Sequence, residues 1–158
     1  MVGTLAVFRT SASQEIGGGH VSRCISLAEY FSKLGWECVF ACGPQTKQVM
    51  PQVKDFETIN ISAPNQVHEA NLIQKNLKRN ASILILDHYQ RDRSFEKSCR
   101  PWAEKIFVID DLANRPHDTD LLLDQSGGRV PQDYINLVPR SCKLILGPKY
   151  SLLRNTFG

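Results

Sequence analysis

The stretch LAVFRTSASQEIGGGHVSRCISLAEYFSKLG, residues 5–35, contains the pattern that decides the fold class. An apolar run over residues 5–8 predicts a strand, and the loop after it ends in three consecutive glycines. From Gly19 to Leu34, apolar residues fill roughly half of a helical surface, and Gly35 then stops the helix. A strand, a glycine-rich loop and a helix in this order form the first unit of an α/β sheet.

The same alternation of short apolar runs and helical segments continues along the chain. Strands are expected over residues 5–8, 37–41, 57–61, 83–87, 106–110, 121–124 and 143–146. Further helices are expected over residues 65–79 and 94–103. Continuous apolar runs are typical of parallel strands that are covered on both faces. We therefore predict a doubly wound, mainly parallel Rossmann-like sheet with right-handed crossovers over residues 1–150.

Composition narrows the class of protein. The 158 residues are 42% hydrophobic and 22% charged, which is typical of one soluble globular domain. The net charge of +3 is too small to indicate nucleic-acid binding, although it suits an anionic small substrate. No apolar run is long enough to cross a bilayer, and we find no signal peptide after Met1. The five cysteines form no CxxC pair, which favours free thiols in a reducing cytoplasm.

Chemically active side chains recur directly after the predicted strands. His20 and the glycines follow the first strand, Asp87 and Tyr89 follow the fourth, and Asp110 and Asp111 follow the fifth. The pair 124–125, Asp-Gln, follows the sixth. In such sheets ligands bind outside the carboxyl ends of the strands. We therefore expect these loops to border one cleft.

The glycine loop has the composition of an anion site. Gly17, Gly18 and Gly19 let the backbone approach a ligand closely, and the helix start offers free N–H groups to a diphosphate. His20 lies in the first turn, where the helix dipole disfavours imidazolium, so a neutral imidazole suited to a general base is expected. The alternatives are a tight turn without a ligand and a packed histidine that only caps the loop. Arg23 either reaches toward an anion or covers the helix surface.

The side chains of Asp87, His88 and Tyr89 can orient a sugar or hold a water molecule at the end of a strand. The alternative is that Asp87 caps the following turn while Tyr89 packs. Asp110 is a further candidate substrate contact. The carboxylates of 110–111 and 117–120 show no metal-ligand spacing, so no metal is expected.

Two familiar nucleotide motifs are absent. The chain has no GxxxxGK[ST], which excludes a P-loop nucleotidase. Ser22 stands where the third glycine of a dinucleotide fingerprint would be, and the second predicted strand has no acidic residue at its end. Binding of NAD is therefore disfavoured, and no cofactor is expected.

Four segments resemble one known family in order and spacing. They are SQEIGGGHVSRC at 13–24, LDHYQ at 86–90, FVIDDLANRPHDTDLLLDQ at 107–125 and YINLVPRSCKLILGPKYSLLRNTF at 134–157. The family is that of the UDP-2,4-diacetamido-2,4,6-trideoxy-β-L-altropyranose hydrolases of bacterial pseudaminic acid biosynthesis, with their spore-coat polysaccharide relatives. The agreement is weakest between residues 45 and 82.

The resemblance implies a specific chemistry. Members hydrolyse a UDP-linked N-acetylated deoxy sugar: water attacks the anomeric carbon, UDP leaves, and the configuration inverts without a metal. The histidine of the glycine loop falls on His20, as the base that activates water, and a tyrosine near the sugar falls on Tyr89. The other positions that match the lining of this cleft are Arg9, Gly18, Gly19 and Asp87.

The resemblance also implies a glycosyltransferase-B architecture of two Rossmann-like domains, similar to the glycosyltransferase that makes lipid II. The second domain supplies most contacts to the nucleotide, and residues 151–158 would begin the connection to it. We therefore expect the isolated chain to be inactive. The alternatives are a glycosyltransferase domain, which uses a hydroxyl acceptor instead of water, and a non-catalytic sugar-nucleotide-binding module.

Overall fold

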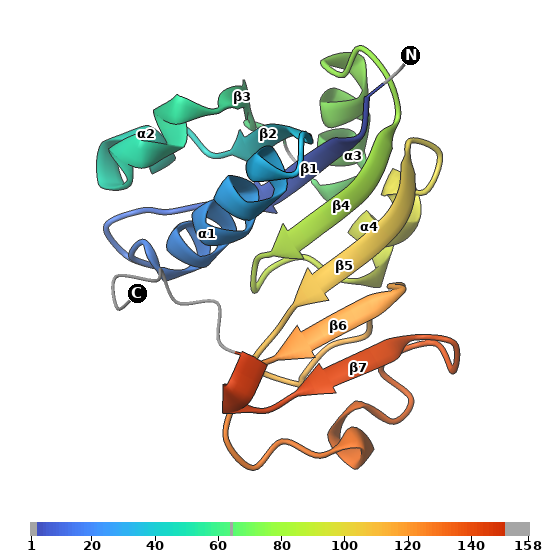
Figure 1. The fold of residues 1–158 in the computed structure, drawn as a ribbon. Coiled ribbons are helices and arrows are strands. Elements are labelled where there is room, and N and C mark those ends of the chain that lie inside the picture. The colour runs from blue at the N-terminus through green and yellow to red at the C-terminus, as the bar shows by residue number, and fades with distance from the viewer. Residues whose placement is uncertain (1–2, 64, 151–158) are drawn as a thin grey trace.

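The computed structural model describes residues 3–63 and 65–150. Within these residues, seven strands form one entirely parallel sheet in the order β3-β2-β1-β4-β5-β6-β7 (Figure 1). The strands are β1 (Leu5–Thr10), β2 (Glu37–Cys42), β3 (Glu57–Asn60), β4 (Ala81–Asp87), β5 (Ala103–Ile109), β6 (Leu121–Asp124) and β7 (Lys143–Leu146). The predicted parallel α/β sheet is confirmed.

Helices connect the strands on both faces of the sheet. The α-helices are α1 (Gly19–Lys33), α2 (Thr46–Val49), α3 (Gln66–Lys75) and α4 (Arg93–Cys99). Three short 3₁₀ segments are also present: η1 (Pro51–Asp55), η2 (Pro131–Tyr134) and η3 (Pro148–Tyr150). The sequence did not predict α2 or the 3₁₀ segments, because three to five residues are too few to show a helical period.

The ends of two helices differ from the sequence prediction. Helix α3 ends at Lys75 instead of residue 79, with Asn76 as its C-cap. Helix α4 ends at Cys99 instead of residue 103, because Pro101 has no N–H with which to continue the helical hydrogen bonds. The strand β5 consequently begins at Ala103, which the sequence prediction had placed in the helix, and Ala103 pairs with Ala81 of β4.

Two apolar layers enclose the sheet. On one face, α1 and η1 pack against alternate side chains of the central strands, and the ring of Phe8 stacks on that of Phe40 with centroids 4.8 Å apart. On the other face, α3, α4 and η2 cover the remaining side chains, and Trp102 lies buried among them. Successive residues of a strand point to opposite faces of the sheet, so the side chains of each strand belong alternately to one layer and to the other.

The chain order reverses between β1 and β4. Helix α1 leaves β1 on the near face in Figure 1, while α3 and α4 lie behind the sheet. The loops after β1 and β4 therefore depart in opposite directions, and this separation leaves a crevice between them. The fold thus places the glycine loop and the residues after Asp87 at the edge where such sheets bind ligands.

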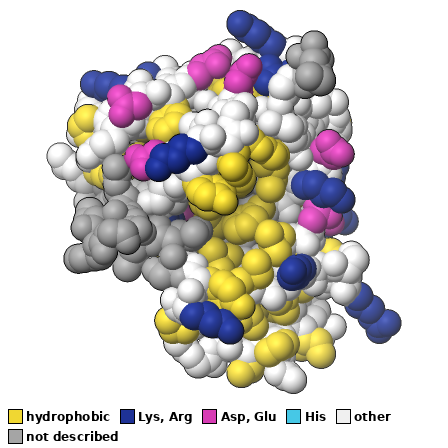
Figure 2. Space-filling model, viewed as in Figure 1, with side chains coloured by type: hydrophobic (Ala, Val, Ile, Leu, Met, Phe, Trp, Pro, Cys, Tyr) yellow, Lys and Arg dark blue, Asp and Glu magenta, His cyan; other side chains and the backbone are white. Residues whose placement is uncertain are grey.

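The near face is not evenly covered by helices. In Figure 1, α1 lies over the central strands and leaves β5, β6 and β7 open on this side. Figure 2, drawn from the same direction, shows hydrophobic side chains gathered in a band over that region. Phe107, Leu121 and Ile145 of these strands are only half-buried.

Three sequence expectations concern features outside the site. All five cysteines are free, and only Cys142 is not buried. Among the helices of the described residues, none is long and apolar enough to cross a membrane. Residues 151–158, expected to begin the connection to a second domain, lie outside the described residues.

Candidate functional site

A pocket of about 340 Å³ opens at the carboxyl ends of β1, β4, β5 and β6. It is lined by Ile16, Gly19, His20, Ser22, Arg23, Tyr89, Asp111 and Gln125. These residues come from all four loops that the sequence placed at this edge. The structure therefore brings together segments that are separated by more than a hundred residues in the chain.

The glycine loop is shaped by left-handed backbone at one position. Gly17 has φ of 72°, a conformation that suits glycine, and its N–H donates to the Ser13 carbonyl oxygen at 2.8 Å. Gly18 is the N-cap of α1 and offers no side-chain oxygen, and the first turn contains no acidic residue. The first-turn N–H groups therefore receive no side-chain cap, which is the state that an anion site requires.

His20 is held by a buried carboxylate. Its Nδ1 lies 2.5 Å from Oδ1 of Asp87, whose side chain is only 1% exposed. Arg23 binds the same carboxylate through two nitrogens: Nη2 donates to Oδ1 at 2.7 Å, and Nε donates to Oδ2. An ionised carboxylate only accepts hydrogen bonds, so Nδ1 of His20 carries the proton. This leaves Nε2 as the nitrogen on the other side of the ring from Asp87.

Arg23 keeps its charge in this cluster. Burial lowers the pKa of Arg23, but the hydrogen bond and the charge of Asp87 outweigh burial and raise it above its ordinary value. The guanidinium therefore neutralises Asp87 from beside His20, whose Nδ1 lies 3.4 Å from Nη2 of Arg23. Its Nη1 also lies 3.8 Å from the carboxylate of Asp111. Arg23 is thus a partner of Asp87 and also lines the pocket, so it does not merely cover the helix surface. Its contact with an anion stays a prediction.

This arrangement changes the role of Asp87. The sequence prediction placed Asp87 against the substrate, but both of its oxygens are taken by His20 and Arg23. The carboxylate lies behind His20 because it is the last residue of β4 and points to the face that α1 covers. Asp87 is therefore positioned to orient His20, not to touch a ligand.

Tyr89 forms one wall of the pocket. It is 42% exposed, and its ring meets that of His20 edge-on with centroids 4.4 Å apart. Its hydroxyl donates to Oδ2 of Asp111 at 3.0 Å. Burial, followed by this hydrogen bond and the charge of Asp111, raises the pKa of Tyr89 to about 12. At neutral pH the phenol is therefore protonated and acts as a donor.

Asp110 is not part of the pocket wall. It is 1% exposed, and its carboxylate accepts hydrogen bonds from Arg115 at 3.0 Å and from the hydroxyl of Tyr134 at 2.9 Å. Burial raises the pKa of Asp110, but Arg115 and Tyr134 outweigh burial and lower it. The chain turns after β5, so that the next residue, Asp111, faces the pocket instead.

Arg9 also points away from the pocket. Its guanidinium is 3% exposed and makes two hydrogen bonds with Glu69 of α3, at 3.0 and 2.9 Å. Arg91 binds the same carboxylate at 2.7 and 2.8 Å. Because Phe8 packs under α1, its neighbour Arg9 must point to the opposite face of the sheet. Arg9 therefore ties β1 to α3 and contributes no side-chain contact to the pocket.

His88 lies beside this cluster, and its ring nitrogen Nδ1 accepts the N–H of Gln90 at 3.1 Å. Burial, assisted by the charges of Arg9 and Arg91, lowers the pKa of His88 to about 3. The ring therefore stays neutral at physiological pH, and it is not a wall of the pocket.

Sequence reasoning did not select Asp111, Gln125 or Ile16 as site residues, although all three line the pocket. The sequence does contain a pattern that points to Asp111 and Gln125, because each directly follows an acidic residue at the end of a strand. Asp124, like Asp110, is buried and bonded to Tyr134, at 2.6 Å. At the end of β5, Asp110 is buried in the core and Asp111 lines the pocket. At the end of β6, Asp124 is buried and Gln125 lines the pocket.

The acidic run after β5 has a structural role. His117 contacts Glu96 through Nδ1 at 2.6 Å. Asp118 and Asp120 both accept hydrogen bonds from Arg100, at 3.0 and 2.8 Å. These side chains hold the β5–β6 connection against α4.

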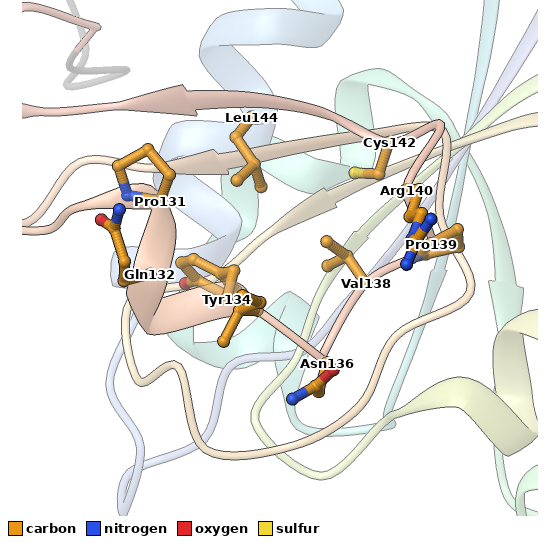
Figure 3. A pocket seen from close by; sticks show the side chains of 10 residues that line it. Pro131, Gln132, Tyr134, Asn136, Val138, Pro139, Arg140, Cys142 and Leu144 are labelled. Atoms are coloured by element: carbon orange, nitrogen blue, oxygen red, sulfur yellow. The ribbon is translucent and has the colours of Figure 1, made fainter.

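A second hollow of about 430 Å³ lies beside η2 and β7 (Figure 3). Its walls include Pro131, Val138 and Leu144, and none of the site residues predicted from the sequence lines it. Tyr134 borders this hollow, but its hydroxyl is bonded to Asp110 and Asp124 in the core. The polar side chains that line the hollow are instead Gln132, Asn136 and Arg140, and the hollow lies apart from the glycine loop.

Comparison with known proteins identifies a relative for this chain. No protein-family model matches the sequence. A protein of Campylobacter jejuni subsp. jejuni serotype O:2, named UDP-2,4-diacetamido-2,4,6-trideoxy-beta-L-altropyranose hydrolase, is 30% identical over 152 residues. The chain is similar to this one protein over nearly all of its own length. The match covers 96% of the chain and 52% of the relative, so the chain spans about half of the relative's length, namely its N-terminal half.

The fold is also found among solved structures. MurG of Acinetobacter baumannii superposes with a TM-score of 0.58 over 89% of this chain and 44% of its own. The two sequences are only 11% identical, so this likeness speaks for the fold alone. It supports the predicted fold class, a Rossmann-like parallel sheet, and the matched part is less than half of the MurG chain.

Proposed function

We propose that this chain forms the sugar side of the active site of a UDP-sugar hydrolase, and that the substrate is a UDP-linked N-acetylated deoxy sugar. One observation carries the proposal: His20 is oriented by Asp87 and opens on a pocket beside an uncapped helix start. A base and a diphosphate site are thus adjacent. The named activity of the Campylobacter jejuni relative supports the same chemistry.

In the proposed reaction, His20 is the general base. Its Nε2 removes a proton from water while the water oxygen bonds to the anomeric carbon of the sugar. The bond between that carbon and the diphosphate oxygen breaks, and UDP leaves with the electron pair. Water attacks opposite the leaving group, so one displacement inverts the configuration. Asp87, 2.5 Å from Nδ1, stabilises the imidazolium that forms.

The remaining residues bind and orient. The backbone of Gly17, Gly18 and Gly19 and the positive end of α1 face the diphosphate. Tyr89 lies against the sugar, because its exposed ring adjoins that of His20. The proposed step uses protein side chains and water, without a cofactor or a metal.

A second domain completes the site in this proposal. The relative is about twice as long as the matched region, which leaves room for a further Rossmann-like domain over the open pocket. That domain would hold the uridine, and residues 151–158 would lead into it. We place the activity in the bacterial cytoplasm, in the synthesis of a nonulosonic acid for cell-surface polysaccharide.

The decisive experiment is turnover of the His20→Ala variant of the intact gene product, with a UDP-linked 2,4-diacetamido sugar as substrate. We expect the release of UDP to fall about 10²–10⁴-fold, the usual effect of removing a general base. Affinity for UDP should change little, because backbone N–H groups hold the diphosphate. Near-normal hydrolysis by the variant would show that His20 is not the base.

The likeness to MurG keeps a glycosyltransferase as a second candidate. The two reactions differ in the acceptor, which is water in one and a hydroxyl group in the other. Reaction in ¹⁸O-water separates them: hydrolysis places the label on the anomeric oxygen of the free sugar, while transfer requires an added acceptor and yields unlabelled product.

A further inference from the structure

Two buried polar atoms in the pocket have no hydrogen-bond partner among the described residues. They are Oδ1 of Asp111, an acceptor, and Nε2 of Gln125, a donor. Both side chains line the pocket that contains His20. A buried polar atom without a partner is costly, and it is uncommon in native proteins.

The two side chains are held in place by their surroundings. The other oxygen of Asp111 accepts the hydroxyl proton of Tyr89 at 3.0 Å, and Arg23 lies 3.8 Å from that oxygen. The backbone oxygen of Asp111 accepts Nη2 of Arg129 at 2.8 Å. Oδ1 is therefore the free atom of a carboxylate that is otherwise fixed. Gln125 directly follows the last residue of β6, which anchors its backbone at the sheet.

Ile16 supplies an apolar surface in the same pocket. It lines the pocket and is 51% exposed, although isoleucine is usually buried. An acceptor, a donor and an apolar side chain are thus present together. Asp111 and Gln125 do not bond to each other, so a ligand that paired with both atoms would need a donor for Oδ1 and an acceptor for Nε2.

We propose that Asp111 and Gln125 form a subsite for an acylamino substituent of the sugar, of which acetamido is the simplest. The N–H of the substituent donates to Oδ1 of Asp111, its carbonyl oxygen accepts from Nε2 of Gln125, and its methyl group packs on Ile16. A hydroxyl substituent offers a single oxygen and no methyl group, so it pairs with these atoms less well. The inference rests on the proposed function in one respect, that the ligand is a sugar.

Binding tests the subsite without any catalytic step. The ¹⁵N-labelled chain is titrated with methyl 2-acetamido-2-deoxyglucopyranoside and, separately, with methyl glucopyranoside, while the side-chain amide resonances are followed by NMR. We expect the Gln125 amide to shift with the acetamido sugar, which should bind about tenfold more tightly than the plain glycoside, the usual effect of one or two hydrogen bonds.

Two substitutions locate the effect. Gln125→Met has nearly the same shape but no donor, and Gln125→Glu keeps an oxygen in place of the amide nitrogen. Both should bring the affinity ratio of the two glycosides close to one. Gln52→Met is the matched control, because Gln52 is exposed on η1, and it should leave the ratio unchanged. The amide spectrum of each variant reports whether it is folded.

The outcomes separate this inference from the proposed function. Equal binding of the two glycosides, binding of neither, or an unshifted Gln125 amide overturns the subsite, whatever the hydrolase assay shows. A preference for the acetamido sugar that disappears in Gln125→Met supports the subsite. If that preference occurs but the intact gene product releases no UDP, the subsite stands and the proposed hydrolysis falls.

Discussion

At the scale of single residues, Asp87 connects the buried core to the chemistry of the pocket. It accepts hydrogen bonds from His20 and Arg23 and is almost wholly buried. The tautomer of His20 therefore depends on a residue that a ligand does not touch. A carboxylate in this position acts by orienting the base and by stabilising its charged form.

The Asp87→Asn variant tests this role. We expect turnover of the intact gene product to fall at least about 10²-fold while the Michaelis constant changes little, because the amide can stabilise the wrong tautomer of His20. Steady-state kinetics with a pH profile is the measurement. A purely structural Asp87 predicts loss of folded protein instead, which thermal unfolding detects. Normal turnover in a folded variant would contradict the orienting role.

At the scale of elements, the junction between β1 and α1 depends on backbone conformation. Gly17 has φ of 72°, and a Cβ added there would meet no atom within 4 Å. Any cost of a side chain at Gly17 is therefore conformational. Gly19, at the start of α1, also has free space for an added Cβ, but it has no positive φ.

Comparison of Gly17→Ala with Gly19→Ala separates the cost of left-handed backbone from the effect of adding a methyl group. We expect Gly17→Ala to destabilise the protein by about 1–2 kcal/mol, because the left-handed region is unfavourable for alanine. Gly19→Ala should be neutral or stabilising by up to about 1 kcal/mol, since alanine favours helix. Urea unfolding of both variants measures the difference. Equal effects on the free energy of unfolding would show that the loop does not require left-handed backbone.

The cluster of Glu69, Arg9 and Arg91 joins α3, β1 and the loop after β4. Burial raises the pKa of Glu69, but hydrogen bonds from Arg91 and Arg9 outweigh burial and lower it from 4.5 to about 2. Because the pKa of Glu69 is lower in the folded state, the contribution of its ionised carboxylate to the free energy of unfolding is complete above pH 4.5. It is lost as the pH falls from 4.5 toward 2.

The Glu69→Gln variant should be less stable at pH 7 by about 3–5 kcal/mol, because two arginines lose a buried partner. The difference between wild type and variant should shrink as the pH falls from 4.5 toward 2, since Glu69 itself becomes protonated. Urea unfolding across this range is the measurement, with the exposed Glu57→Gln of β3 as control. A difference that is independent of pH would contradict the lowered pKa.

At the scale of the whole molecule, the pocket belongs to one edge of the sheet. Among the described residues, those that line it all come from the loops and the helix start at this edge. We expect the chain of 158 residues to unfold cooperatively but to release no UDP above background, while the intact gene product turns over. A coupled UDP assay on both proteins measures this. Full turnover by the 158-residue chain would contradict the need for a second domain.

The sequence by itself determined the sheet, the edge that carries the site and the glycine loop. These features depend on local patterns: apolar runs specify strands, the helical period specifies α1, and consecutive glycines with His20 are contiguous in the chain. The parallel order then follows, because strands joined by helices pair in this way. Even the meeting of Tyr89 with His20 follows from topology alone.

Only the tertiary structure decided which neighbouring residue faces the pocket. Asp111 lines it while Asp110 is bonded to Tyr134, and Arg9 reaches Glu69, which lies 60 positions away. Spacing in the sequence cannot reveal such pairs, because a buried charge selects its partner by distance in space. The direction in which a chain leaves its strand is set by the packing around it. For that reason Asp87 lies behind His20 and not in the wall of the pocket.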